Sequence, residues 1–180
     1  MRQFKLWMVV GVLALGLTAC GESGGTGGAV DSNEGLGAFM GAIALDLAQV
    51  MADLAPPFQT LAVKQDGSTT CPGGGDATWM ESGTGAGTLG LNDCVMRGIT
   101  VNGTLSGFLE SGPMSVSATM LRGPITATGG VSGELSVTNL VLQAQIPITD
   151  ELTYWEVTAT DANNKMLCAW SGGPGCAPMF

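Results

Sequence analysis

Two kinds of hydrophobic periodicity divide this chain. Between residues 34 and 55 apolar side chains recur at steps of three and four, the spacing of one face of a helix. From about residue 60 onward apolar and polar side chains alternate, which is typical of strands with one buried face. The helical stripe consists of Leu36, Phe39, Met40, Ile43, Leu47, Val50, Met51 and Leu54.

The ends of the helix are marked by polar residues and prolines. Asp31, followed three residues later by Glu34, fits a capping box at the start. Pro56 and Pro57 end the helix. The segment is apolar enough to raise the question of a membrane span. Asp46 and Asp53 argue against it, because each carboxylate costs a few kcal/mol at bilayer depth, and packing on a sheet is favoured.

The alternating part predicts short strands joined by Gly-rich turns. Strands are expected over residues 61–64, 68–71, 76–81, 84–92, 99–110, 114–121, 125–128, 131–146, 152–160 and 165–170. Turns are expected at 72–75, 111–113, 123–124, 129–130 and 163–164, where Gly, Pro and Asn gather. In segment 131–146 the apolar phase changes from odd positions (Leu135, Val137) to even ones (Leu140, Leu142), which indicates a bulge.

These elements favour an α+β fold, mainly β. We expect a curved antiparallel meander sheet, an open or closed barrel, packed on the one N-terminal helix. The β domain at 60–180 then forms one globular unit with helix 34–55. A two-sheet sandwich with the helix at one end, and a solenoid built from the Gly-rich hairpins, are the alternatives. The tail from Ser171 to Phe180 is expected to be irregular and held by Cys176.

The N-terminus has the pattern of an export signal. Arg2 and Lys5 precede an apolar run from Leu6 to Leu17, which is short of a membrane span. The run ends in Leu17-Thr18-Ala19-Cys20, which resembles the lipobox of bacterial lipoproteins. The resemblance implies that residues 1–19 are a signal peptide, that the Cys20 sulfur takes a diacylglyceryl group, and that its freed amine takes a further acyl chain such as palmitate. An ordinary secretory signal and an uncleaved anchor helix are the alternatives.

Residues 20–33 are expected to be the lipidated Cys20 followed by a Gly-rich tether. In Gram-negative lipoproteins an Asp after the cysteine favours the inner membrane. Gly21 at this position implies the outer membrane if the source is Gram-negative. The resemblance thus implies a cell-envelope protein whose membrane contact is made through lipid.

Charge narrows the class of partner. The chain has a net charge of −9, and removal of residues 1–19 leaves four cations against fifteen acids, a net charge of −11. An acidic, cation-poor surface argues against nucleic acid and against direct adhesion to anionic lipid heads.

Four cysteines remain after Cys20: Cys71, Cys94, Cys168 and Cys176. An even number in an exported protein favours two disulfides over free thiols. Three pairings are possible. We expect Cys71–Cys94 and Cys168–Cys176, because each pair closes a short local loop.

Catalytic, metal and cofactor sites are not expected. The chain has no His, which removes Ser–His and Cys–His nucleophiles, and it has no Cys-x-x-Cys. Asp76 and Glu81 bracket one strand and Asp150 and Glu151 are adjacent, but nothing places two carboxylates opposite each other. The oxygen-rich turn 161–165 lacks the ligand spacing of a calcium loop, and the glycines of 83–87 lack a βαβ setting.

Two functions suit a chain of this kind. One is a non-catalytic binding or structural module that contacts an envelope protein; the other is a carrier of a lipid or similar hydrophobic ligand, by fold-level analogy with helix-covered half-barrels. Trp79, Tyr154, Trp155 and Trp170 are candidates for a ligand mouth, although Trp155 shares its face with Val157 and suits the core. A void of roughly 300 Å³ or more inside the sheet favours the carrier, and a filled core favours the module.

A second resemblance concerns the globular part. The segment containing Cys71, Asn92-Asp93-Cys94 and Val101-Asn102-Gly103-Thr104 is similar to small β-rich bacterial envelope lipoproteins. This resemblance covers about a fifth of the chain. It implies no activity.

Overall fold

A single curved sheet and one helix make up the described part of the chain. The computed structural model describes residues 28–55, 66–83, 85–149 and 153–177. The elements are β1 (Gly28–Ala29), α1 (Asn33–Leu54), β2 (Gly67–Thr70), β3 (Asp76–Gly83), β4 (Ala86–Met96), β5 (Ile99–Gly112), β6 (Ser115–Gly129), β7 (Val131–Gln145), β8 (Thr153–Asp161), β9 (Met166–Trp170) and β10 (Gly173–Pro174).

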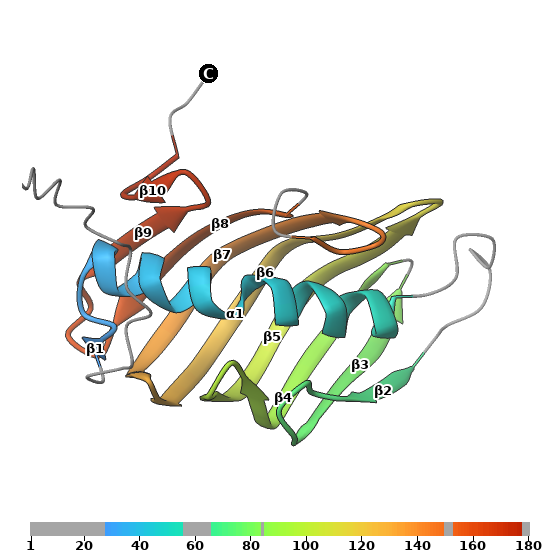
Figure 1. Cartoon of the computed structure of the whole chain (residues 1–180), viewed down its shortest axis with the longest axis horizontal. Coiled ribbons are helices and arrows are strands. Elements are labelled where there is room, and N and C mark those ends of the chain that lie inside the picture. Colours follow the sequence, from blue (N-terminus) through green and yellow to red (C-terminus); the bar gives the residue numbers. More distant parts are fainter. Residues whose placement is uncertain (1–27, 56–65, 84, 150–152, 178–180) are drawn as a thin grey trace, which may run out of the picture.

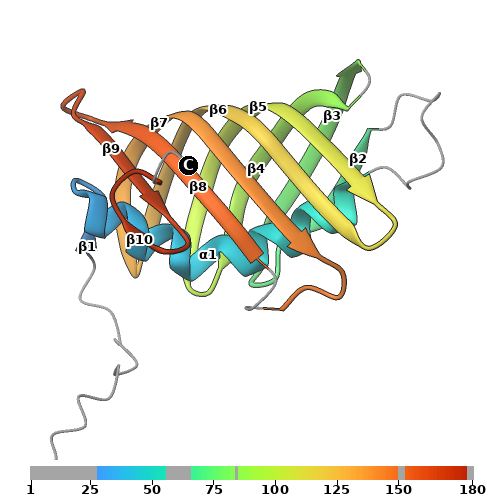
Figure 2. The ribbon, with the colours of Figure 1, turned by 90° about the horizontal axis from the view of Figure 1, so that it is seen from above.

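The sheet is an open meander. Each strand from β2 to β9 pairs antiparallel with the next one in the chain, and the short β1 pairs in parallel with the start of β7. The two end strands, β2 and β10, are not joined by hydrogen bonds, and α1 lies across the concave face (Figures 1 and 2). The expected mainly-β fold, with a curved meander packed on one helix, is confirmed in its open form; the described residues form neither a sandwich nor a solenoid.

Helix α1 buries its apolar stripe against the sheet. All eight residues of the predicted stripe are buried, and α1 contacts every strand from β2 to β10. The prediction of an Asp31 cap was wrong. Ser32 is the N-cap: its backbone is extended and its hydroxyl accepts a hydrogen bond from the Gly35 N–H at 3.0 Å. Asp31 precedes the cap by one residue, so Ser32 provides the side chain that satisfies this free helical N–H.

The helix ends two residues before Pro56, the first of the two prolines predicted to stop it. Leu54 is its last residue, and Ala55 caps it with a backbone N–H bonded to the Met51 oxygen. Pro56 and Pro57 lie outside the described residues, as does the strand predicted at 61–64.

Strand β6 differs from the prediction for this part of the chain. Segments 114–121 and 125–128, expected to be two strands around a Gly123-Pro124 turn, form one continuous strand. The pairing with β7 shifts register between Ala118 and Leu121 and again between Leu121 and Gly123. A strand tolerates proline at such an irregularity, where a ladder hydrogen bond is already missing. Strand β7 shifts register against β8 between Val137 and Asn139, which matches the predicted change of phase.

Two disulfides close local loops, with the expected pairing. Cys71 bonds to Cys94, and Cys168 bonds to Cys176. The second bond holds a tail that is less irregular than predicted: Gly173 and Pro174 form the edge strand β10, paired with Trp170 and Ala169.

Candidate functional site

The space between helix and sheet is filled. It is lined by apolar side chains from α1 and from the inner face of β4 to β8, and its residual volume is about 10 Å³. That is room for at most about one water molecule, and the lining offers such a water no polar partner. The lining residues are Leu36, Phe39, Met40, Ile43, Leu47, Leu91, Val101, Leu105, Ile125, Leu135, Val137, Leu140 and Val157. This pocket between helix and sheet therefore has no room for an acyl chain.

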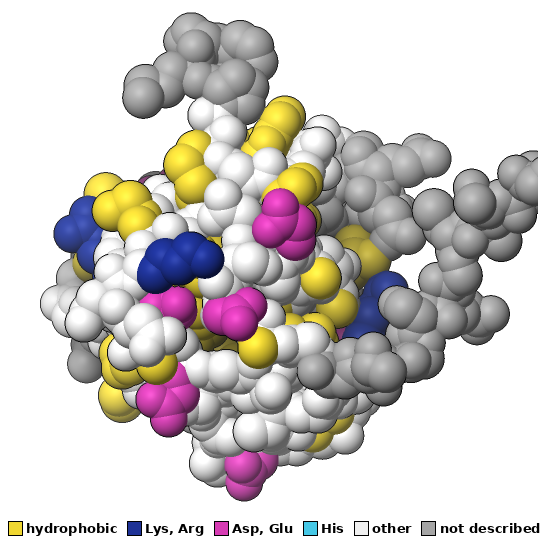
Figure 3. Space-filling model, turned by 90° about the vertical axis from the view of Figure 1, so that its left-hand side faces the viewer, with side chains coloured by type: hydrophobic (Ala, Val, Ile, Leu, Met, Phe, Trp, Pro, Cys, Tyr) yellow, Lys and Arg dark blue, Asp and Glu magenta, His cyan; other side chains and the backbone are white. Residues whose placement is uncertain are grey.

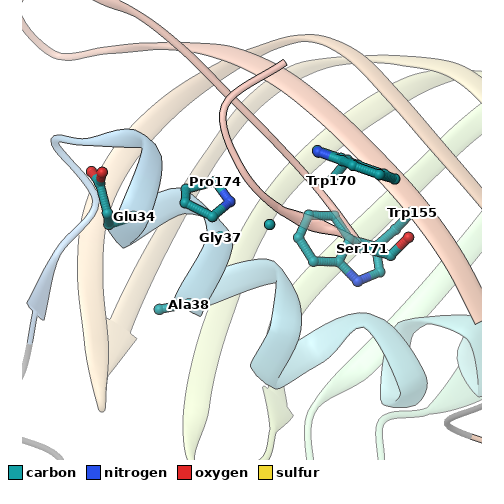
Figure 4. A pocket seen from close by; sticks show the side chains of 8 residues that line it. Glu34, Gly37, Ala38, Trp155, Trp170, Ser171 and Pro174 are labelled. Carbon is teal, nitrogen blue, oxygen red and sulfur yellow. The ribbon is translucent and has the colours of Figure 1, made fainter. Parts of the chain in front are cut away.

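A larger space lies at the edge of the sheet. An open cleft of about 370 Å³ separates the first turns of α1 from the ends of β8, β9 and β10. Its lining is mostly apolar and consists of Glu34, Gly37, Ala38, Trp155, Trp170, Ser171, Gly173 and Pro174. We call this space the Trp cleft. In Figure 4 the indoles of Trp155 and Trp170 lie on one side of it, while Pro174 and, beyond it, Glu34 lie on the other.

Small residues on the helix make the cleft possible. At Gly37, a Cβ atom would lie 3.7 Å from the Cβ of Ala169 and 3.9 Å from the Cα of Pro174. These are ordinary contact distances, so a side chain fits there, but any atoms beyond Cβ would occupy the cleft. The absence of a side chain at Gly37, with only a methyl group at Ala38, leaves the two indoles accessible from the helix side.

The opposite wall is held by backbone bonds and a disulfide. The Ser171 N–H donates to the Trp155 oxygen at 2.9 Å, and the Gly175 N–H donates to the Cys168 oxygen at 2.9 Å. The Cys168–Cys176 bond ties the end of this loop to β9. The wall thus has a fixed position relative to α1, since the Cys168 N–H also donates to Oδ1 of Asn33 on the helix, at 2.9 Å.

The four aromatic candidates separate into three environments. Trp155 and Trp170 line the Trp cleft, although Trp155 is 92% buried and also serves the core, as its shared face with Val157 predicted. Trp79 is fully buried, and its indole N–H has no hydrogen-bond partner. Tyr154 lies away from the cleft; its hydroxyl donates to Oε2 of Glu156 at 3.0 Å.

Tyr154 is the one described residue whose ionisation is clearly shifted. Desolvation by burial, then the hydrogen bond to Glu156 and the charge of that carboxylate, raise the pKa of Tyr154 above its usual value of 10.0. The three causes act in the same direction because each disfavours the phenolate.

The buried carboxylates serve local structure. Oδ1 of Asp161 accepts from the backbone N–H of Asn163 and of Lys165, both at 2.8 Å, and so closes the turn between β8 and β9. Oε1 of Glu81 accepts from the Gly85 N–H across the β3–β4 hairpin. In the part of the chain that the structure describes, no three His, Cys, Asp or Glu side chains cluster as metal ligands. Asp150 and Glu151 lie outside it.

The face beside the cleft carries charges of both signs. Figure 3 views the molecule from the side of Figure 1 where β9, β10 and the start of α1 lie, and there acidic and basic side chains border exposed apolar ones. Lys165 donates from Nζ to the backbone oxygen of Asp31 at 2.8 Å, and it does not line the cleft.

The predicted lipid site lies outside the described residues, because these begin at residue 28. Helix α1 is long and apolar enough to cross a membrane by length and composition. In this fold, however, its apolar stripe packs against the sheet.

Comparison with known proteins gives no relative from which to transfer a function: no family model, curated protein or solved structure matches this chain.

Proposed function

We propose that this protein is a lipid-anchored protein of the bacterial cell envelope whose β domain is a non-catalytic binding module. The Trp cleft is its binding site for a partner. The observation that carries the proposal is the contrast between a filled interior of about 10 Å³ and an open, mostly apolar cleft of about 370 Å³. The cleft is in the size range of natural ligand sites.

The anchor is supported by the lipobox at Leu17–Cys20, and the position of β1 limits how far the domain can lie from it. The described chain starts at Gly28, eight residues after Cys20. Eight residues span at most about 27 Å, so the domain stays close to the bilayer. The cleft lies on the same side of the molecule as β1, because the start of α1 forms one of its walls. A partner bound there is held near the membrane surface.

The carrier hypothesis is less well supported. It needs an apolar space of roughly 300 Å³ or more between helix and sheet. The described side chains leave about 10 Å³ there, lined by Leu, Val, Ile, Phe and Met. The binding-module hypothesis needs no such space.

Site-specific photo-cross-linking in intact cells tests the proposal. A photo-reactive phenylalanine analogue replaces Ala38, which is exposed in the cleft, or Gln49, which is exposed on the same helix eleven residues further along. The expected result is one adduct of defined mass from position 38 and none from position 49.

A second variant tests whether the adduct at position 38 depends on the cleft. Gly37→Leu places its side chain in the cleft and is expected to abolish the adduct at position 38 while leaving the protein folded and exported. Equal adducts from positions 38 and 49, an adduct that survives Gly37→Leu, or no adduct at all would contradict the proposal.

A further inference from the structure

We propose that the occupant of the Trp cleft is a segment of a partner protein that presents an Arg or Lys next to apolar residues. The apolar groups lie against the two indoles, and the cationic group lies near Glu34. This inference rests on the proposed binding function and adds the chemistry of the partner.

The two ends of the cleft differ in chemistry. One end has the indoles of Trp155 and Trp170, and the other has the Glu34 carboxylate beyond Pro174 (Figure 4). Gly37 lies between these ends and offers backbone without a side chain. An elongated ligand with an apolar part and a polar part therefore fits better than a compact one.

The negative charge at the cleft favours a cationic group as the polar part of the ligand. Glu34 is the one charged residue among the eight that line the cleft. The chain as a whole has a net charge of −9. The nearby Lys165 is directed at the backbone oxygen of Asp31, so it is engaged outside the cleft. An anionic ligand meets repulsion here, and a cationic one meets both the local carboxylate and the long-range field.

The indoles add affinity at the other end of the cleft. The apolar neighbours of the cationic residue and its methylene stem pack on the indole surface. Glu34 has a second possible role, because an acid in the first helical turn offsets the helix dipole. That structural role affects stability and has no influence on which peptide binds, so peptide selectivity separates the two roles.

Calorimetric titration of the purified lipidated protein in a non-ionic detergent tests the inference. Three capped peptides share the sequence Pro-Leu-Pro and end in Arg, Gln or Glu. At low salt the Arg peptide is expected to bind about fivefold more tightly than the Gln peptide, which is the upper end of the worth of an exposed ion pair. The Glu peptide is expected to bind most weakly.

Two matched variants locate the charge effect. Glu34→Gln is expected to bring the Arg-to-Gln affinity ratio to about one. Glu134→Gln makes the same change of net charge at an exposed position on β7, and is expected to leave the ratio at about five. A ratio that stays at about five in Glu34→Gln overturns the inference, because the preference then does not depend on Glu34.

The outcomes also separate this inference from the proposed function. If all three peptides bind wild type equally and Gly37→Leu abolishes binding, the cleft is a binding site without cation selectivity and only the inference is overturned. If Gly37→Leu leaves the binding of every peptide unchanged, peptides bind elsewhere, and the inference and the cleft both fail. If no peptide binds while the position-38 adduct forms in cells, the partner chemistry stated here is wrong and the binding function stands.

Discussion

The side-chain oxygen of Asn33 accepts a hydrogen bond from the backbone N–H of Cys168 at 2.9 Å. Asn33 is the first residue of α1, and Cys168 lies in β9 and forms one half of the disulfide that holds the tail. The bond therefore joins the two walls of the Trp cleft across 135 positions of sequence. Helix and tail are positioned relative to each other by this contact as well as by apolar packing.

Removal of that acceptor is expected to weaken the fold. Asn33→Ala leaves the Cys168 N–H without its partner, at an expected cost of about 1–2 kcal/mol in the free energy of unfolding. Asn33→Asp keeps an oxygen at this position, favourable at a helix N-terminus, and is expected to remain within about 0.5 kcal/mol of wild type. Urea unfolding measures both variants. An Ala variant as stable as the Asp variant would show that the bond does not contribute.

Gly87 is required by the ring of Trp79. A Cβ atom at this position would lie 2.5 Å from Cζ2 of Trp79 and 2.5 Å from the Met80 oxygen. Gly87→Ala is therefore expected to lower the free energy of unfolding by about 1–3 kcal/mol through overpacking. Gly41→Ala is the control: it meets nothing within 4 Å in the exposed part of α1 and is expected to stabilise the protein by up to about 1 kcal/mol. If Gly87→Ala and Gly41→Ala shift the midpoint of thermal unfolding in the same direction, the packing of Trp79 against Gly87 is contradicted.

We expect one disulfide to contribute to overall stability and the other to hold one wall of the Trp cleft. Loss of Cys71–Cys94, with a sequence separation of 23, is expected to lower stability by about 3 kcal/mol without a specific effect on the cleft. Loss of Cys168–Cys176 frees the loop that carries Ser171, Gly173 and Pro174, so affinity for the Arg peptide is expected to fall several-fold. Paired Cys→Ala variants and calorimetry under conditions where both remain folded measure this. Equal affinity in both double variants is the result that contradicts the role of the tail.

The single tyrosine of the chain reports on its own environment. Because burial, the hydrogen bond and the charge of Glu156 raise the pKa of Tyr154, folded protein holds this proton more tightly than unfolded protein. The resulting stability is fully present below pH of about 10 and is lost as pH rises through the folded-state pKa. Ultraviolet titration is expected to give a midpoint above 10.0 in wild type, and a lower midpoint in Glu156→Gln. A wild-type midpoint at or below that of unfolded protein rules out this environment.

Local patterns predicted most of the fold. The eight-residue stripe identified the buried face of α1, alternation identified the inner face of the strands, and short spacings identified both disulfides. Predictions failed where a local signal had two structural solutions. Gly123-Pro124 suits a turn, and it equally suits an irregularity inside a long strand, as in β6. Asp31 and Ser32 are both good N-cap residues. Ser32 is the cap because the helix begins at Asn33, the residue directly after it.

The Trp cleft could be predicted only in part. Trp155 and Trp170 were candidates by residue type, but alternation placed Trp155 in the core, where most of its surface does lie. Glu34, Gly37 and Pro174 were not predicted, because no periodicity indicates that the first turns of a helix will lie beside a tail more than 130 positions later. The absence of a side chain at Gly37 is a weak signal in a chain with 29 glycines.

A native mass spectrum of the protein purified from its own membrane tests the central claim most directly, with Cys20→Ala as control. The account predicts a wild-type chain that starts at Cys20, carries covalent acyl groups and has no co-purified free lipid; Cys20→Ala is expected to remain an unacylated, uncut precursor. An unacylated wild-type chain with a different first residue would contradict the anchor. A stoichiometric free lipid that stays bound to wild type would contradict the filled interior and support a carrier.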